Sequence, residues 1–135
     1  MVNANPALNT WQRLYRITSG ISAAVALVLG ILGSLLTSDG GIRPAHAGFA
    51  MLFVVTSLLA SLAALRYAKL SGNKGGIGHA FGVFGLSLVQ YALGEMHVTM
   101  VHIILGVLIV LGALSLFVLA MRQPASAPDS AAPQA

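Results

Sequence analysis

Residues 88–111 of the chain read LVQYALGEMHVTMVHIILGVLIVL, and this stretch decides the fold. Two apolar segments meet here at a very short polar joint, Gly94-Glu95-Met96-His97, and His102 follows inside the second segment. We expect one membrane-spanning helix on each side of this joint. Ionisable side chains are rare inside a bilayer and usually face a protein interior, so His102 indicates an internal site.

The totals of the chain indicate a membrane protein. Of 135 residues, 57 % are hydrophobic and 7 % are charged, and the mean hydropathy is +0.88. Soluble proteins carry about 25 % charged residues on average. A transmembrane helix needs roughly 20 mostly apolar residues, and four such stretches are present, at 14–36, 45–67, 77–93 and 97–121. We therefore predict an all-α fold, a transmembrane four-helix bundle.

The chain divides into three parts around these spans. Residues 1–12 form a polar N-terminal lead-in, in which Asn9-Thr10 is a candidate helix cap. Residues 13–122 form the four-helix membrane domain. Residues 123–135 are rich in proline, alanine and serine, and we expect this C-terminal tail to be disordered. The first span lacks an evident A-x-A cleavage site, so we interpret it as a helix rather than a signal peptide.

The basic residues predict the orientation of the helices. Those at the helix ends on one side of the membrane are Arg13, Arg16, Arg66, Lys69, Lys74 and Arg122. The opposite loops carry a single basic residue, Arg43, together with Asp39 and Glu95. By the positive-inside rule, the side richer in basic residues is cytoplasmic. We therefore expect a multi-pass protein of the inner (cytoplasmic) membrane, with both termini in the cytoplasm.

The composition excludes several classes of function. The chain has no cysteine, which rules out disulfides, iron–sulfur clusters and thiolate ligands. The basic residues sit at helix ends and form no run, so we expect no nucleic-acid partner. The only acids, Asp39, Glu95 and Asp129, lack the partner groups that hydrolysis or phosphoryl transfer requires. The expected partners are the lipid bilayer and either other membrane subunits or a second copy of the chain.

Four glycines mark one face of the third span. They stand at positions 75, 78, 82 and 85, a spacing that places them on one side of a helix. Small residues on one face let membrane helices pack closely, so we expect this face to point inward. The alternative is that the glycines leave room for a flat cofactor.

Depth in the membrane separates the four histidines. His79 begins the third span on the cytoplasmic side, where a ring at the membrane interface is the simplest interpretation. His46, His97 and His102 lie toward the outer side. His97 and His102 are about 140° apart around a helix, so we expect them to point to different places. His102 is also about 7.5 Å deeper than His97, where water is harder to reach.

His46 and His102 are the candidates for a shared site. Histidine is the commonest metal ligand, and helix bundles build cofactor sites from side chains on facing helices. The functional interpretation is axial ligation of one haem b by His46 and His102. Gly106, one turn beyond His102, would leave space for a porphyrin edge, and Gln90 adds a hydrogen-bonding group at similar depth. Two imidazole ligands saturate the iron, which favours electron transfer over oxygen binding.

Other interpretations of these residues stay open. In one, His46 and His102 are unrelated histidines that bond to backbone or water. In another, Met96 and Met100 join the neighbouring histidines to bind copper, because thioether and imidazole ligands suit Cu(I). His97 is the alternative haem ligand on the fourth span.

Short motifs resemble one half of the heme A synthase family. They are Ala45-His46-Ala47 at the start of the second span, Gln90-x-x-Leu93-Gly94 at the end of the third, and Val101-His102-x-x-x-Gly106 in the fourth. That family has two four-helix halves, each with histidines on its second and fourth helices near the outer surface. The resemblance implies that His46 and His102 are haem ligands. The family's catalytic half also has a glutamate shortly before the second-helix histidine, whereas this chain has Arg43 there and contains only one half.

We therefore expect a small membrane b-type cytochrome that binds one haem near the outer face. Its role would be electron transfer, or that of a haem-carrying subunit in a respiratory complex. The alternatives are a half-size enzyme similar to heme A synthase and a membrane assembly subunit without a cofactor. Whether the chain is an enzyme stays open at this point.

Overall fold

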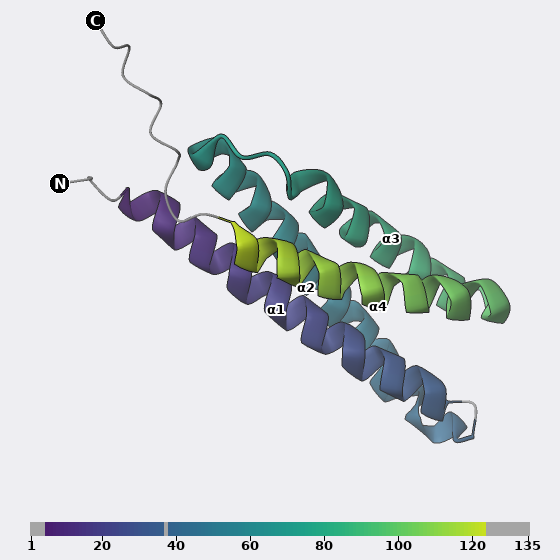
Figure 1. The fold of residues 1–135 in the computed structure, drawn as a ribbon. Helices are drawn as coiled ribbons and strands as arrows, with labels where there is room; N and C mark the ends of the chain where they lie inside the picture. The colour runs from purple at the N-terminus through teal and green to yellow at the C-terminus, as the bar shows by residue number, and fades with distance from the viewer. Residues whose placement is uncertain (1–4, 37, 124–135) are drawn as a thin grey trace, which may run out of the picture.

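The computed structural model describes residues 5–36 and 38–123. These residues form four α-helices and one short 3₁₀ turn (Figure 1): α1 (Pro6–Leu35), η1 (Gly40–Ile42), α2 (Arg43–Ser71), α3 (Ile77–Glu95) and α4 (Thr99–Arg122). No strand occurs in this part of the chain. The predicted all-α four-helix fold is confirmed. The C-terminal tail that we predicted to be disordered lies, beyond Gln123, outside the described residues.

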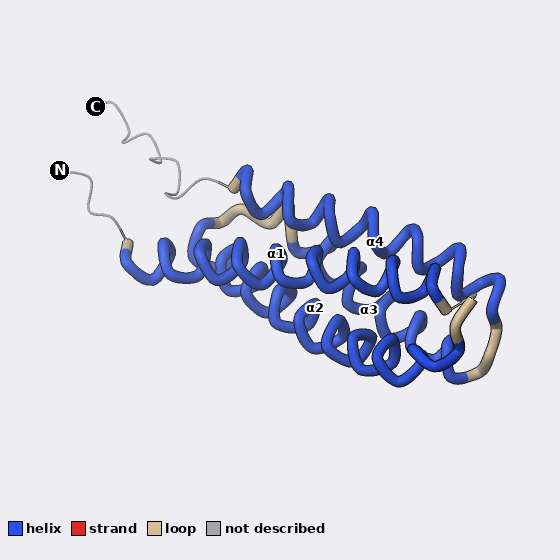
Figure 2. Tube along the Cα trace, turned by 90° about the horizontal axis from the view of Figure 1, so that it is seen from below, coloured by secondary structure: helices blue, strands red, loops and turns tan. Residues whose placement is uncertain are grey.

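The four helices run antiparallel and form a ring (Figures 1 and 2). α1 packs against α2 and α4, and α3 packs against the same two helices, so α2 and α4 lie diagonally opposite each other. α1 begins and α4 ends at one end of the bundle. We call residues 27–36, 38–52 and 88–108, at the opposite end, the distal half. The other described residues form the terminal half.

All four helices are long and apolar enough to cross a membrane. Large apolar side chains cover their outward faces, and Ile31, Leu62 and Leu108 remain 61 %, 47 % and 57 % exposed. Water would disfavour so much exposed apolar surface, whereas lipid accepts it. The chain is therefore a multi-pass membrane protein, as its composition predicted.

Local sequence signals set the helix ends. The Asn5 side chain accepts hydrogen bonds from the backbone N–H groups of Ala7 and Leu8 at 3.1 and 3.3 Å, and Pro6 fits the first helical turn. α1 therefore begins at Pro6 rather than near residue 14, and it includes most of the predicted lead-in. α2 is followed by Gly72, whose φ of +76° is a left-handed conformation that glycine adopts without strain.

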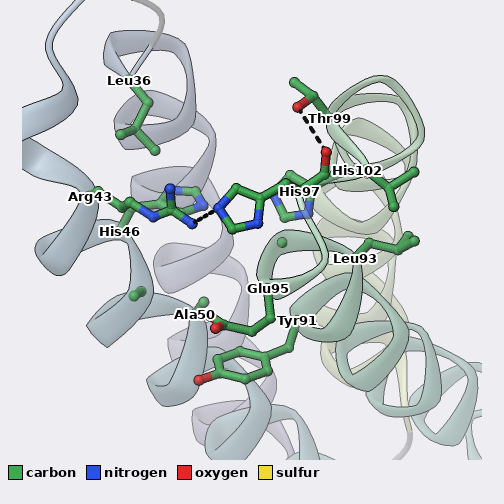
Figure 3. Close-up of a pocket in the computed structure, with 13 residues that line it drawn as sticks. Leu36, Arg43, His46, Ala50, Tyr91, Leu93, Glu95, His97, Thr99 and His102 are labelled. Atoms are coloured by element: carbon green, nitrogen blue, oxygen red, sulfur yellow. Dashed lines mark hydrogen bonds between the residues drawn. The ribbon is translucent and has the colours of Figure 1, made fainter.

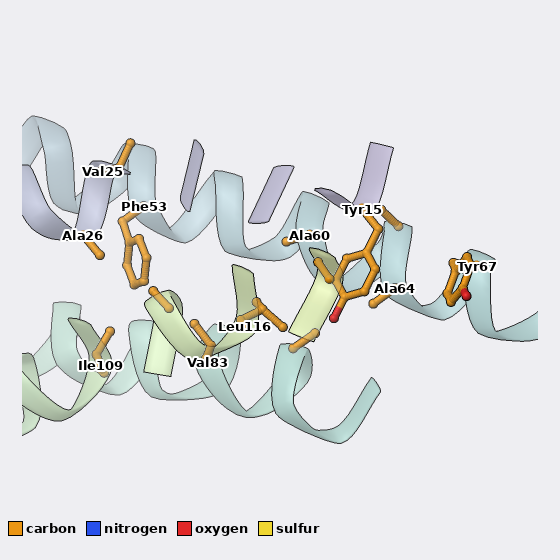
Figure 4. Close-up of a cluster of buried hydrophobic side chains, with 14 of the residues drawn as sticks. Tyr15, Val25, Ala26, Phe53, Ala60, Ala64, Tyr67, Val83, Ile109 and Leu116 are labelled. Atoms are coloured by element: carbon orange, nitrogen blue, oxygen red, sulfur yellow. The ribbon is translucent and has the colours of Figure 1, made fainter. Parts of the chain in front are cut away.

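Buried side chains gather in the terminal half (Figure 4). Tyr15 and Tyr67 stack with their ring centroids 6.3 Å apart, and Leu116 of α4 has no exposed surface. Alanines and serines fill the space between these helices, which lets the backbones approach closely. In the distal half, no described residue is buried. The two halves of one bundle are therefore packed very differently.

Hydrogen bonds between helices also hold the terminal half. Arg16 donates to the carbonyl oxygens of Ala120 and Gln123 at 3.3 and 2.9 Å, where α4 ends and its last carbonyls lack helical partners. Ser22 of α1 donates to the hydroxyl of Thr56 of α2 at 3.1 Å. These bonds fix α1 against both of its neighbours at the end where the core lies.

Three of the α3 glycines singled out by their spacing do not pack against another helix. A Cβ added at Gly78, Gly82 or Gly85 would meet no atom within 4 Å. The expectation that this glycine face points inward is therefore wrong, because the face meets open space. A close contact occurs instead at Gly20 of α1, where an added Cβ would lie 3.2 Å from the Phe117 ring of α4. Spacing shows that glycines share a face, but it does not show what that face meets.

Candidate functional site

His46 and His102 face each other at the distal end of the bundle (Figure 3). His46 lies in the first turn of α2 and His102 in the first turn of α4. Their ring centroids are 6.1 Å apart, and the ring planes meet at 63°. The two helices lie diagonally opposite each other in the ring of four. The structure thus brings together the two histidines that the sequence singled out.

A cavity of about 480 Å³ adjoins this pair, and all four helices line it. We call it the main cavity. It extends to Ala26, Phe53 and Ile109, the first buried residues of the core. Its wall is mainly apolar, and its polar lining side chains are Ser34, His46, Ser87, Gln90, Tyr91, Thr99 and His102. The distal half therefore encloses space where the terminal half encloses side chains.

Hydrogen bonds to Gln90 hold His102 in place. The Nδ1 atom of His102 lies 3.0 Å from the backbone oxygen of Gln90, and the Gln90 side chain donates from Nε2 to the backbone oxygen of His102 at 2.8 Å. A carbonyl oxygen only accepts, so Nδ1 of His102 carries the proton and Nε2 keeps its lone pair. Metal-ligating histidines typically donate their other ring N–H in this way.

Two side chains that line the main cavity each have a buried polar atom without a partner. Nδ1 of His46 and Oε1 of Gln90 are buried and make no hydrogen bond within the described part of the chain. A buried polar atom without a partner costs roughly 1–3 kcal/mol, so such atoms are rare in native structures. The Tyr15 hydroxyl in the terminal half is a third such atom. Those of His46 and Gln90 belong to side chains around one cavity, which favours a site that a bound group completes.

Each histidine ring rests against a glycine. A Cβ added at Gly33 of α1 would lie 3.4 Å from Cε1 of His46, and one added at Gly94 of α3 would lie 3.1 Å from Cε1 of His102. These two glycines leave the space that the rings occupy. We did not predict a role for either, because each is close to its histidine only in the folded bundle.

Gly106 gives room to Gln90. A Cβ added at Gly106 would lie 2.9 Å from Nε2 of Gln90, so the amide occupies part of the space that we assigned to a porphyrin edge. Gly106 also lines the main cavity. The two residues therefore act together, since the glycine admits the amide that holds His102.

His97 and Arg43 cover the site from outside (Figure 3). Arg43 donates from Nη2 to Nε2 of His97 at 2.8 Å, and both residues line a smaller pocket of about 200 Å³ together with His46 and His102. The expectation that His97 and His102 point to different places holds only in part, because both line this pocket but only His102 lines the main cavity. α4 begins at Thr99, so His97 precedes the helix and the helical angle between the two does not apply.

His97 also has an uncommon backbone conformation. Its φ of 58° is in the left-handed region, which costs an L-residue other than glycine roughly 1–2 kcal/mol. This conformation belongs to the tight α3–α4 joint and turns the ring back over the pocket (Figure 3). Strained residues of this kind cluster at functional sites.

The remaining candidates lie elsewhere. His79 bonds through Nε2 to the backbone oxygen of Gly112 at 2.9 Å, which joins α3 to α4 in the terminal half. Met96 and Met100 are 69 % and 71 % exposed and line neither cavity. Within the described residues, no three or more histidine, aspartate or glutamate side chains gather as a metal-binding group. The structure therefore leaves the pair of His46 and His102 as the central feature of the site.

Comparisons with known proteins give no further identity. No protein-family model, curated protein or solved structure matches the chain. The resemblance to the heme A synthase family therefore stays a prediction from short motifs. The case for function rests on the geometry of the site.

Proposed function

We propose that the chain is a small membrane b-type cytochrome that binds one haem b between His46 and His102. The observation that carries the proposal is the facing pair of rings, 6.1 Å apart, at the main cavity. At this separation both imidazoles could bind one iron, since metal–imidazole bonds are about 2 Å long. The observed spacing supports this ligand pair.

The main cavity supports a cofactor of this kind. Sites for small molecules and cofactors have volumes of about 300–1,000 Å³ and mostly apolar walls with a few placed polar groups. The main cavity has a volume of about 480 Å³, and its wall is mostly apolar. His46, whose Nδ1 has no partner, lines this cavity, and the bonded Nδ1 of His102 leaves Nε2 available as a ligand.

Such a haem would be held by His46 and His102 and would supply one-electron transfer, since ligation by two imidazoles favours electron transfer over oxygen binding. The residues of the chain would bind and orient it. The Gln90 backbone holds the ring of His102, and the apolar walls exclude water. The role that follows is electron transfer, or that of a haem-carrying subunit in a respiratory complex.

The charge distribution supports a location in the cytoplasmic membrane with both termini inside. All lysines and arginines other than Arg43 belong to the terminal half, and the side richer in basic residues is cytoplasmic. In this orientation, His46 and His102 lie near the outer face. A cysteine introduced at position 40 should react with impermeant reagents added from outside, and reaction only from the cytoplasm would overturn the orientation.

The proposal is tested by the absorption spectrum of the purified protein, oxidised and reduced. We expect a low-spin haem b spectrum. His46→Ala and His102→Ala should each abolish it, whereas His79→Ala and His97→Ala should leave it intact. Normal haem in both His46→Ala and His102→Ala would reject the site. Loss in His97→Ala but not in His102→Ala would assign the α4-side ligand to His97.

The same purified protein distinguishes electron transfer from the alternative functions. A colourless protein would indicate a membrane assembly subunit without a cofactor. Copper in a metal analysis, without haem, would favour a copper-handling protein. A chemically modified haem in an organic extract would favour an enzyme similar to heme A synthase. Each of these outcomes would replace the electron-transfer proposal.

A further inference from the structure

Arg43 stands apart from the other basic residues of the chain. It is the only one in the distal half, and it lies one helical turn before His46 on α2. Its guanidinium donates to the ring of His97, which must be neutral at Nε2 to accept this bond. Glu95 lines the same pocket, yet Arg43 bonds to the imidazole of His97. A full positive charge at the smaller pocket is thus matched with a neutral group.

The first turns of α2 and α4 add to the positive potential near Arg43. α2 and α4 both begin at the distal end, and neither has a side chain that caps its first N–H groups, since Ile42 and Val98 stand at the cap positions. α1, by contrast, is capped by Asn5. Uncapped N–H groups and the positive end of the helix dipole favour an anion. The guanidinium and the first turns of the two helices therefore both favour the binding of an anion.

A haem b carries two carboxylates, and an apolar cavity cannot solvate them. Moving an ionised carboxylate into such a cavity is very unfavourable unless the group is paired. The carboxylates of a haem held by His46 and His102 would therefore face the smaller pocket at the distal end of the bundle, where Arg43 lies. Arg43 offers them a planar group with several N–H donors, the geometry that suits carboxylates best.

We propose, on the basis of the proposed function, that Arg43, positioned by His97, binds the carboxylates of the haem at the smaller pocket. His97 is then a positioning residue. Its backbone conformation directs its ring toward Arg43, and its bond holds the exposed guanidinium at the smaller pocket, which His46 and His102 also line. The single exception to the charge bias of the chain is explained by the cofactor.

The experiment compares haem b with its dimethyl ester, which has the same iron and ring but no carboxylate charge. Each is titrated into cofactor-free protein in a neutral detergent, and the ratio of the two dissociation constants is measured. In Arg43→Gln, the ratio should move toward the ester by about tenfold, the effect of one lost charge-assisted hydrogen bond. In Arg43→Lys the shift should be smaller. In Arg122→Gln, which removes the same charge from the other end of the bundle, the ratio should not change.

The outcomes separate the two proposals. An unchanged ratio in Arg43→Gln, with a normal low-spin spectrum, would overturn the role of Arg43 and leave haem binding intact. Binding of neither compound by the unmodified protein would overturn both proposals. His97→Ala should retain the low-spin spectrum while its ratio shifts by about two- to threefold. An equal shift in Arg122→Gln would also overturn the proposal, because the effect would then come from net charge.

Discussion

The terminal and distal halves of this bundle use the same four helices in opposite ways. In the terminal half, Tyr15, Tyr67 and Leu116 are buried and hydrogen bonds join the helices. In the distal half no described residue is buried, and His46 and Gln90, which line the main cavity, each have a polar atom without a partner. Figure 1 shows the tips of the α1–α2 and α3–α4 hairpins apart at that end. One half holds the helices together, which allows the other to keep space for a ligand.

The largest effect that we expect from this difference concerns two leucines of α4. Leu116 has no exposed surface, whereas Leu108 is 57 % exposed. Leu116→Ala leaves a cavity in the terminal half and should lower the free energy of unfolding by about 2–5 kcal/mol. Leu108→Ala removes the same atoms from a face that meets lipid and should cost less than about 0.5 kcal/mol. Equilibrium unfolding in detergent measures both, and equal losses would contradict the division into two halves.

The next test adds volume at two glycines of α1. At Gly20 an added Cβ lies 3.2 Å from Phe117, but at Gly30 the nearest atom belongs to Val110 at 3.8 Å, and Gly30 lines the main cavity. Gly20→Leu should therefore destabilise the bundle by about 1–3 kcal/mol through overpacking. Gly30→Leu should not destabilise it, because the side chain enters existing space.

Gly30→Leu also sharpens the proposed function. The leucine occupies part of the main cavity, so uptake of haem should fall in a protein that is otherwise stable. Thermal unfolding and the absorption spectrum of the same sample give the two readouts. Full haem uptake by Gly30→Leu would mean that the cofactor does not use this space.

The sequence was sufficient to predict the fold and the histidine pair. Apolar length fixes the number of spans, and a buried ionisable residue demands a partner at similar depth, so His46 and His102 could be paired before any coordinates. The apolar pattern places the start of α1 too late, because Asn5 and Pro6 extend the helix beyond its apolar part. Polarity marks where a helix leaves the membrane rather than where it ends.

The rest of the site depends on contacts between helices. The rings of His46 and His102 rest against Gly33 and Gly94, which are distant from them in sequence. The bond between Arg43 and His97 joins residues that are also distant, and His97 lies in irregular backbone. His97 was assigned to a helix, whereas it lies in a joint with positive φ. In a protein whose helices are apolar all round, periodicity does not show which face is internal, so the direction of the α3 glycines could not be predicted.

The smallest effect concerns two serines of α1 in the terminal half. Both are fully buried, but the hydroxyl of Ser22 donates to Thr56 of α2 at 3.1 Å, whereas that of Ser19 donates to the Tyr15 carbonyl of its own helix at 2.6 Å. Ser22→Ala removes a bond between helices and should cost about 0.6 kcal/mol, the average for such bonds in membrane proteins. Ser19→Ala should be close to neutral, because the Tyr15 carbonyl keeps its bond within the helix and alanine favours helix formation. A loss in Ser19→Ala as large as that in Ser22→Ala would show that packing around the hydroxyls, rather than the bond to α2, holds the terminal half together.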